Sequence, residues 1–325
     1  MNESRTPPPE VTVHRTSPSA LTGDVDRLFE ACAAPALDRH RPVWIKVNGN
    51  FNIAYPGSNT SPWFLRALLA SLRDRGYRDV TVVEGDLPEF RAEDMARSTG
   101  LAALLEKFGV PFVSYERMPR DEFELPRALA DVQLLNTPVF HTHGHATISC
   151  ATKNLFGLLP VTRRRYHTIL SDKLLELAAL VPCVTLVDGT VGLEGESTRR
   201  GDPVRCDLLV GGRDPVAIDV VAARLMGFDP ESVPLLRMAL DVGRVTLDVP
   251  VRGDFEAKAL PAQRFVLTLG RIRKTVHWLT DHGVDVDPLL ALTDGLRATW
   301  HRVNYRQKKR KLAEGPWREY ESAGA

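Results

Sequence analysis

Short apolar runs rich in β-branched residues alternate with amphipathic segments along most of the chain. The run Val-Trp-Ile-Lys-Val at 43–47 predicts a buried strand, which an Asn-Gly-Asn turn at 48–50 ends. A leucine-rich segment at 63–75 predicts a helix, because Ser-Pro at 61–62 supplies an N-cap and a first-turn proline. A second apolar strand is expected at 80–84. This order of strand, helix and strand indicates parallel strands joined by a right-handed crossover.

The same alternation continues to about residue 226. It predicts an α/β fold with a mixed, mainly parallel sheet and flanking helices. We expect further helices at 92–108, 170–180 and 215–226, and further strands at 110–115, 132–140, 183–187 and 207–210.

Composition divides the chain into three parts. Residues 1–22 are rich in Pro, Ser and Thr, and this bias predicts a disordered tail. Residues 23–250 carry the alternating pattern and form the predicted α/β domain. Residues 251–325 are expected to form a helical C-terminal extension with a basic tail, in which helices lie near 261–281 and 287–301.

The overall charge and hydropathy of the chain limit the classes of binding partner that we expect. Of 325 residues, 43% are hydrophobic and 26% are charged, and the formal net charge is +1. These values are ordinary for a globular protein and argue against a nucleic-acid partner. The basic run at 306–311 is therefore interpreted as a solvated helix end. No apolar run reaches about 18 residues, so no membrane partner is expected, whereas an oligomer is left open.

The cysteines limit the metal chemistry and the compartment. Cys32, Cys150, Cys183 and Cys206 are far apart and form no C-x-x-C pair, so no iron–sulfur cluster is expected. The first residues lack the apolar segment of a secretory signal. Both features predict reduced thiols and a cytoplasmic location.

Three histidines fall within five residues, at His141, His143 and His145. Imidazole is the commonest metal ligand and titrates near neutral pH. In an extended strand these side chains share one face at a spacing of about 7 Å, which lets two of them approach one ion. Gly144 predicts a bend that would allow a carboxylate or water to complete the site. The competing interpretations are hydrogen bonds to the backbone and direct binding of an anion.

A second group of polar residues follows the histidines. Lys153 and Asn154 lie in an apolar and hydroxylic stretch. A lysine there either extends to solvent or is buried to hold a phosphate or carboxylate. The three arginines at 163–165 and His167 add donors suited to an anion, although a solvated loop is the competing interpretation.

Polar residues also lie at the ends of predicted strands. Asp188 and Glu194 lie on a glycine-rich stretch where ligands gather in such folds, so each suits a general base or metal ligand, with a simple turn as the alternative. Lys46 and Asn48 end the first strand and suit anion binding as well as ordinary capping. Asp219 lies in an apolar helix, where a buried carboxylate needs a partner.

Several motifs occur together in one order: Ile-Lys-Val-Asn at 45–48, Thr-Ser-Pro at 60–62, His143 with Thr147, Lys-Asn-Leu-Phe-Gly at 153–157, His167, Val-Asp-Gly and Glu-Gly within 187–195, and Gly-x-Asp-Pro-Val-Ala-x-Asp at 212–219. In this order they resemble the domain of unknown function 362 family, from about Val43 to Ala239. The resemblance implies a mixed α/β fold and an enzyme of unassigned reaction. Some relatives carry a ferredoxin-like cysteine cluster that hints at redox work, and this chain lacks those cysteines. His141 stands where the family pattern more often has a lysine.

Together these residues predict an enzyme that acts on a small anionic metabolite in a cleft at the carboxyl ends of the strands. A divalent metal is one candidate cofactor, and a redox step would need an external flavin, nicotinamide or metal. The alternative is a non-catalytic binding or scaffold protein that uses the C-terminal helices. The predicted substrate-binding residues are Lys46, Asn48, Lys153, Asn154 and His167. The predicted catalytic residues are His141, His143, Asp188 and Glu194, and the candidate metal ligands are His141, His143, His145 and Asp188.

Overall fold

The computed structural model describes residues 9–195, 199, 201–267 and 315–323. Its strands are β1 (Val11–Arg15), β2 (Val43–Val47), β3 (Val80–Glu84), β4 (Phe112–Ser114), β5 (Gln133–Thr137), β6 (Val139–His143), β7 (Thr147–Ser149), β8 (Cys183–Glu194), β9 (Asp202–Gly212) and β10 (Val251–Gly253). Its α-helices are α1 (Leu21–Cys32), α2 (Pro62–Asp74), α3 (Ala92–Ser98), α4 (Leu101–Phe108), α5 (Ala151–Leu155), α6 (Leu170–Leu180), α7 (Pro215–Met226), α8 (Pro234–Asp241) and α11 (Arg318–Ala323).

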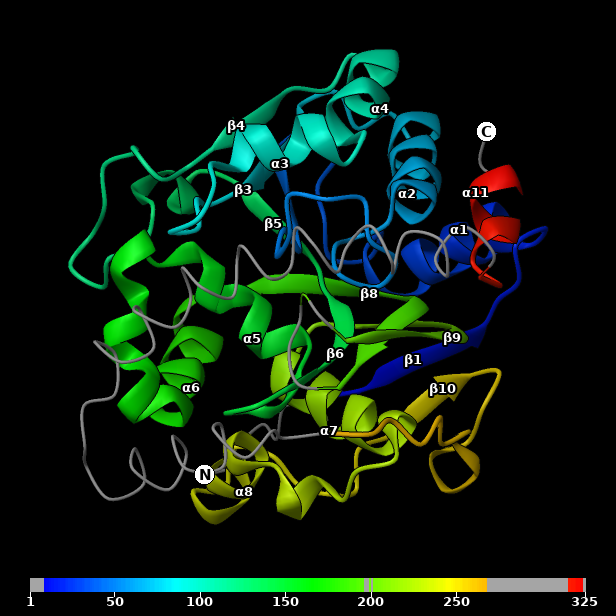
Figure 1. Ribbon diagram of the computed structural model, residues 1–325, viewed down its shortest axis with the longest axis vertical. Coiled ribbons are helices and arrows are strands. Elements are labelled where there is room, and N and C mark those ends of the chain that lie inside the picture. Colours follow the sequence, from blue (N-terminus) through cyan, green and yellow to red (C-terminus); the bar gives the residue numbers. More distant parts are fainter. Residues whose placement is uncertain (1–8, 196–198, 200, 268–314, 324–325) are drawn as a thin grey trace, which may run out of the picture.

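These strands form one sheet with helices on both sides (Figure 1). Along the sheet the order is β10-β1-β9-β8-β5-β2-β3-β4, and β6 pairs with both β7 and β8. The central pairs β5–β2, β2–β3, β3–β4 and β5–β8 are parallel, whereas β9 runs antiparallel to both β8 and β1. The predicted α/β class with a mixed, mainly parallel sheet is confirmed.

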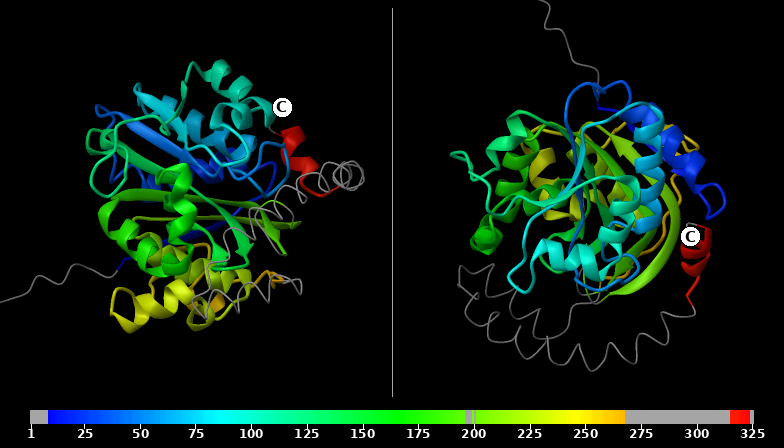
Figure 2. Two further views of the ribbon diagram at one scale, coloured as in Figure 1. Left: turned by 60° about the vertical axis from the view of Figure 1, so that its left-hand side comes forward. Right: turned by 90° about the horizontal axis from the view of Figure 1, so that it is seen from above.

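Strand β2 shows how alternate residues serve two helical layers. Ile45 lies in the apolar core that the sheet forms with α1, α2 and α4. Trp44 points to the other face, where it joins a core with residues of α5 and α6. Because side chains alternate along a strand, Lys46 shares the face of Trp44 and is directed toward the α5 side. Figure 2 shows the two helical layers from two further directions.

Residues 11–15 form a strand of the sheet, which corrects the prediction of a disordered tail for that part of residues 1–22, whereas residues 1–8 lie outside the described residues. Strand β1 lies between β9 and β10, and Val11 and Val13 are fully buried. Helix α1 begins at Leu21 and packs against α2. The Pro, Ser and Thr content concealed a short strand because its partners, β9 and β10, come from far along the chain.

The C-terminal part also departs from a purely helical extension over 251–325. Strand β10 pairs in parallel with β1, so the sheet continues past residue 250. Residues 261–267 of the helix predicted at 261–281 are not helical, and Phe265 is buried in the core with α7. The rest of that helix, the helix at 287–301 and the basic run at 306–311 lie outside the described residues.

Helix α11 packs against the main domain. Tyr320 is fully buried, its ring stacks on Trp63 with the ring centroids 5.9 Å apart, and its hydroxyl donates to Asp207 Oδ1 at 2.7 Å. Residues near the C-terminus are therefore bound to both α2 and β9. None of the helices in the described ranges has the length and apolar character needed to cross a bilayer.

Candidate functional site

The carboxyl ends of β2 and β3 meet in a buried ion pair. Lys46 is 1% exposed, and its Nζ lies 3.0 Å from Oε1 and 3.2 Å from Oε2 of Glu84, which is also buried. Burial lowers the pKa of Lys46, and the Glu84 carboxylate opposes that shift. Since the two strands pair in parallel, they bring these side chains to the same edge of the sheet.

The Glu84 carboxylate also holds three backbone or side-chain donors around Lys46. It accepts the Gly49 and Gly85 N–H groups, each at 2.8 Å, and the Tyr115 hydroxyl at 2.9 Å. The Tyr115 hydroxyl lies 3.0 Å from the Gly157 carbonyl oxygen, within the Lys-Asn-Leu-Phe-Gly motif. Burial and the neighbouring Glu84 charge raise the pKa of Tyr115 well above its ordinary value. Glu84 and Tyr115 were not predicted as site residues.

Two amide side chains attach α5 to β5. Asn154 Nδ2 donates to Asn136 Oδ1 at 2.8 Å, and Asn136 Nδ2 donates to the Ala151 carbonyl at 3.0 Å. Both asparagines are buried. Asn154, a predicted anion-binding residue, thus donates a hydrogen bond to another side chain of the protein. This bond holds the helix that carries Lys153 against β5.

Asp219 on α7 holds the start of α5. Its Oδ1 accepts the Ala151 N–H at 2.7 Å and its Oδ2 accepts the Thr152 N–H at 3.0 Å. Burial raises the pKa of this carboxyl to about 6, although the two N–H donors oppose the shift. The partner that a buried carboxylate requires is therefore the α5 backbone.

Lys153 has no acceptor among the described residues. Its Nζ lies 5.4 Å from the centroid of the Phe156 ring, and the described part of the chain contains no hydrogen bond or ion pair to this ammonium group. Burial, together with the positive charge of Arg163, lowers the pKa of Lys153 to about 8. The residue as a whole is partly rather than fully buried.

Arg163 is a second cation that pairs with no carboxylate in the described part of the chain. It lies on the 3-10 helix η3 (Val161–Ile169) and is only 8% exposed. Its guanidinium donates to the carbonyls of Leu159, Pro160 and Asp86, each at 3.2 Å, and forms no ion pair with any described residue. The solvated-loop interpretation of residues 163–165 is therefore wrong for Arg163, because this side chain is buried and reaches the Asp86 carbonyl just after β3.

His167 lies beside both cations on the same 3-10 helix. Its Nδ1 donates to the Arg164 carbonyl at 2.7 Å, an arrangement that leaves Nε2 as the acceptor of a neutral ring. The His167 ring centroid lies 5.8 Å from that of Phe156 and 5.7 Å from that of His145. Burial, together with the Lys153 charge, lowers the pKa of His167 to about 4, so the ring is neutral at physiological pH.

The histidine cluster is divided between two environments. The predicted bend at Gly144 is confirmed by a turn at 144–146 between β6 and β7. His143 Nδ1 accepts the N–H groups of His145 and Ala146 in this turn. His141 is buried and its Nε2 donates to the Gly57 carbonyl, while burial lowers the pKa of the ring to about 4. Backbone hydrogen bonding, one of the competing interpretations, therefore applies to His141 and His143.

The four candidate metal ligands do not meet. Within the described ranges, no three His, Cys, Asp or Glu side chains lie close enough to hold a metal ion together. Asp188 Oδ2 accepts the Ser61 N–H at 2.8 Å at the start of α2, and its Oδ1 accepts the Thr190 hydroxyl at 2.6 Å. The structure thus corrects the grouping of Asp188 with the histidines, because unpaired backbone donors at a helix start engage its carboxylate.

Two other predicted residues also serve local structure. Glu194 Oε2 accepts the Val266 N–H at 2.7 Å at the far end of β8. Asn48 Nδ2 donates to the Ser58 carbonyl at 3.1 Å, and the Asn48 N–H donates to the Thr60 hydroxyl at 2.8 Å. Both side chains hold loops together rather than facing the cations.

The residues that the fold brings together form what we call the cationic cluster: Lys46, Lys153 and Arg163, with Glu84 and His167. Three cations and one carboxylate leave an excess of two positive charges. Arg163 lowers the pKa of both lysines, which indicates that its charge acts on each of them. A partly buried excess of positive charge is stabilised by binding an anion.

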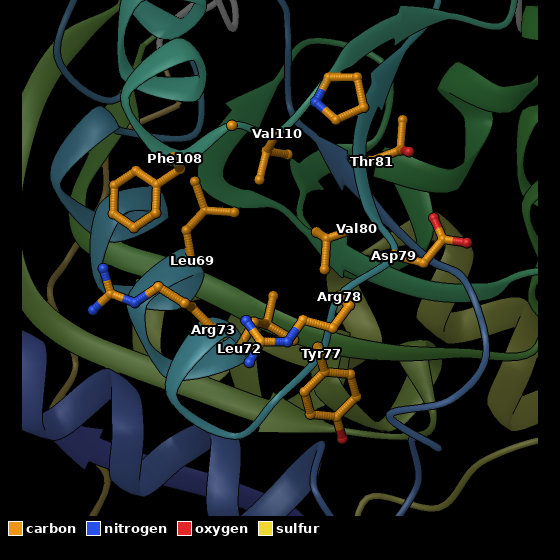
Figure 3. A pocket seen from close by; sticks show the side chains of 12 residues that line it. Leu69, Leu72, Arg73, Tyr77, Arg78, Asp79, Val80, Thr81, Phe108 and Val110 are labelled. Carbon is orange, nitrogen blue, oxygen red and sulfur yellow. The ribbon is translucent and has the colours of Figure 1, made fainter.

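A pocket of about 240 Å³ lies at the opposite end of the parallel strands (Figure 3). Its walls come from the end of α2, the start of β3 and the segment between α4 and β4, and Leu69, Val80 and Phe108 make part of its apolar lining. None of the predicted site residues lines it. The chemistry of the chain is therefore concentrated at the carboxyl ends, as expected for α/β sheets.

The fold is that of a layered α/β protein, and the cationic cluster lies at the carboxyl ends of its parallel strands. The chain belongs to the DUF362 family, since the model for "Domain of unknown function (DUF362)" matches residues 43–224. One similar protein is the thylakoid-associated protein sll1697 of Synechocystis sp., which is 27% identical over 189 residues. That match covers 51% of this chain and 59% of the relative.

Proposed function

We propose that the chain is an enzyme that acts on a small anionic metabolite bound at the cationic cluster. The observation that carries this proposal is Lys153, a partly buried ammonium with no acceptor among the described residues, near a buried guanidinium that forms no ion pair with a described carboxylate. A charge that no protein group neutralises is costly to bury, so a ligand of opposite charge gains affinity there.

The neighbouring neutral imidazole supports catalysis in addition to binding. His167 presents an unprotonated Nε2 near physiological pH, because its Nδ1 proton is committed to the Arg164 carbonyl. A neutral ring next to a bound anion is suited to accept a proton from the ligand. In the proposal, Lys153 and Arg163 bind the anion, Lys46 with Glu84 supports the floor of the site, and His167 moves the proton.

The test is the stabilisation of the protein by small anions. Phosphate, oxalate, succinate and pyruvate are added separately, and thermal unfolding is followed for the wild type and for Lys153→Met. A bound anion at about 100 times its Kd stabilises the folded state by about 2.7 kcal/mol. At least one anion should raise the Tm of the wild type and leave that of Lys153→Met unchanged.

Lys107→Met is the matched control, since Lys107 is exposed on α4 and distant in sequence from the cluster. It should respond to the anion as the wild type does. An equal response from Lys153→Met, or the absence of any response in the wild type, would contradict the proposal.

We also propose the cytoplasm as the compartment of this protein. The support is that Cys32, Cys150, Cys183 and Cys206 are all free thiols in the structure, as is usual in a reducing environment. The name of the relative places that protein at thylakoids, so a membrane-surface association is the competing location. Cell fractionation distinguishes the two, because a cytoplasmic protein stays in the supernatant after the membranes are pelleted.

A further inference from the structure

We propose that Lys153 forms an imine with the carbonyl carbon of a small 2-oxo acid, whose carboxylate binds Arg163. This inference rests on the proposed function and specifies its substrate class. The geometry behind it is a cluster in which one amine, one guanidinium and one imidazole surround the Phe156 ring and the loop that follows it.

The amine is prepared for nucleophilic attack by its surroundings. Lys153 Nζ lies over the Phe156 ring and has no hydrogen-bond acceptor in the described ranges, so no described carboxylate or carbonyl stabilises its protonated form. An apolar neighbour and a second cation are the two features that activate lysine amines in proteins. With a pKa of about 8, about a tenth of the Lys153 side chains are unprotonated at pH 7.

The Arg163 guanidinium has further N–H donors that could bind a carboxylate. Arginine has five N–H donors, and the carbonyls of Leu159, Pro160 and Asp86 occupy at most three of them. At least two N–H groups therefore have no acceptor among the described residues, which is the number a carboxylate accepts in a bidentate pair. A ligand with a carboxylate next to a carbonyl would satisfy Arg163 and place its carbonyl carbon toward Lys153.

The step is balanced by groups already present. The Lys153 nitrogen donates its electron pair to the carbonyl carbon, a C–N bond forms, and the carbonyl electron pair moves to oxygen. His167 Nε2 carries two protons in turn from the nitrogen to that oxygen: the first converts the alkoxide into a hydroxyl group, and the second lets the hydroxyl group leave as water when the C=N bond forms. One amine and one carbonyl give one imine and one water, so no oxidant or reductant is needed.

The experiment traps the imine by reduction. The full chain is incubated with glyoxylate, pyruvate, 2-oxobutyrate or 2-oxoglutarate in the presence of cyanoborohydride, and the modified residue is identified by peptide mass mapping. With at least one of these acids, Lys153 should be labelled at least about tenfold faster than the exposed lysines, because more of its amine is unprotonated. Acetone, which lacks the carboxylate, should label Lys153 at least about tenfold more slowly.

Two variants serve as controls for this trapping. Lys153→Arg keeps the positive charge and the fold but should lose the adduct, whereas Lys107→Met should keep it. Labelling spread evenly over exposed lysines, or no labelling of Lys153 by any of the four acids, would overturn the imine. If anions still stabilise the wild type and not Lys153→Met in that case, the proposed anion-binding function stands while the imine fails.

Discussion

The Lys46 ammonium fills the space beside Gly157 that a side chain at this position would need. A Cβ on Gly157 would lie 2.8 Å from Lys46 Nζ and 3.3 Å from Glu84 Oε1. Because Nζ is buried and bound to the Glu84 carboxylate, it cannot move away cheaply. The close approach explains why a glycine ends the Lys-Asn-Leu-Phe-Gly motif.

Gly157→Ala is therefore expected to destabilise the protein. Overpacking of this kind costs about 1–3 kcal/mol in free energy of unfolding, which urea denaturation measures. Gly23→Ala is the control, since no heavy atom lies within 4 Å of the space for a Cβ at that position of α1. The control should be neutral or more stable by about 0.5–1 kcal/mol. Equal stability of both variants would mean that Lys46 does not need the space.

The buried Lys46–Glu84 pair should show strong energetic coupling. Removing one partner, in Lys46→Met or Glu84→Gln, leaves a buried group unpaired and should cost about 3–5 kcal/mol. The double variant should lose clearly less than the sum of the single losses. The exposed pair of Arg237 and Asp241 provides the comparison cycle, with a coupling of no more than about 1 kcal/mol. The prediction is wrong if the two cycles give similar coupling energies.

The Asp219 carboxyl should make the free energy of unfolding of the wild type depend on pH. The Asp219→Asn variant should lack this contribution. The folded pKa of about 6 lies above the ordinary value of 3.8, so the folded state binds this proton more tightly than the unfolded state does. The stabilising contribution is complete below about pH 4 and is lost as pH rises through about 6. The difference in free energy of unfolding between wild type and variant should fall over this range, by up to about 3 kcal/mol.

Urea unfolding at several pH values between 4 and 7 measures this difference. Asp241→Asn is the matched control, because Asp241 is exposed at the end of α8. Asp241→Asn should not reproduce the pH profile of Asp219→Asn. A flat profile for Asp219→Asn would contradict the raised pKa of Asp219.

Anion binding should weaken as pH rises through about 8. The pKa of Lys153 is lowered to about 8 by burial and by Arg163, so the ammonium loses its charge above that pH. Nearby His141 and His167 have pKa values of about 4 and remain neutral throughout this range. Calorimetric titration with an anion that stabilises the wild type should therefore show a Kd that increases by about tenfold per pH unit well above 8.

Lys153→Arg provides the control for this titration, because a guanidinium stays charged at all these pH values. Its Kd should be nearly constant between pH 7 and 10. If the wild type is equally insensitive to pH, Lys153 does not contribute its charge to the bound anion.

The sequence pattern predicted those helices and strands that nearby residues are enough to identify. Strands β2 and β3 and helices α6 and α7 have the predicted bounds. Apolar runs, caps and turn residues mark these elements within the sequence itself. Strand β1 was missed, since its five residues become a strand through pairing with β9 and β10. One predicted helix at 92–108 is two, α3 and α4, because Gly100 adopts a left-handed conformation with φ 82°.

The site was predicted in part for the same reason. Lys46, Lys153 and His167 were named from residue type and motif, and all three belong to the cationic cluster. Glu84, however, is 38 residues from Lys46 in sequence and Tyr115 is 31 residues from Glu84. A charge at the end of one strand acquires its partner through strand order, which no local pattern encodes. The one available signal was opposite charge at the ends of two adjacent parallel strands.

The amino-acid sequence by itself determined the fold class, the family motifs and the edge of the sheet at which polar residues gather. Only the tertiary structure decided which of those residues have their hydrogen-bonding capacity taken up by the protein. Asp188, Asn154 and His141 bond to neighbouring backbone or side-chain groups, whereas Lys153 has no acceptor among the described residues. The physical reason is that buried polar groups must pair, and the partners come from distant elements that meet only after folding.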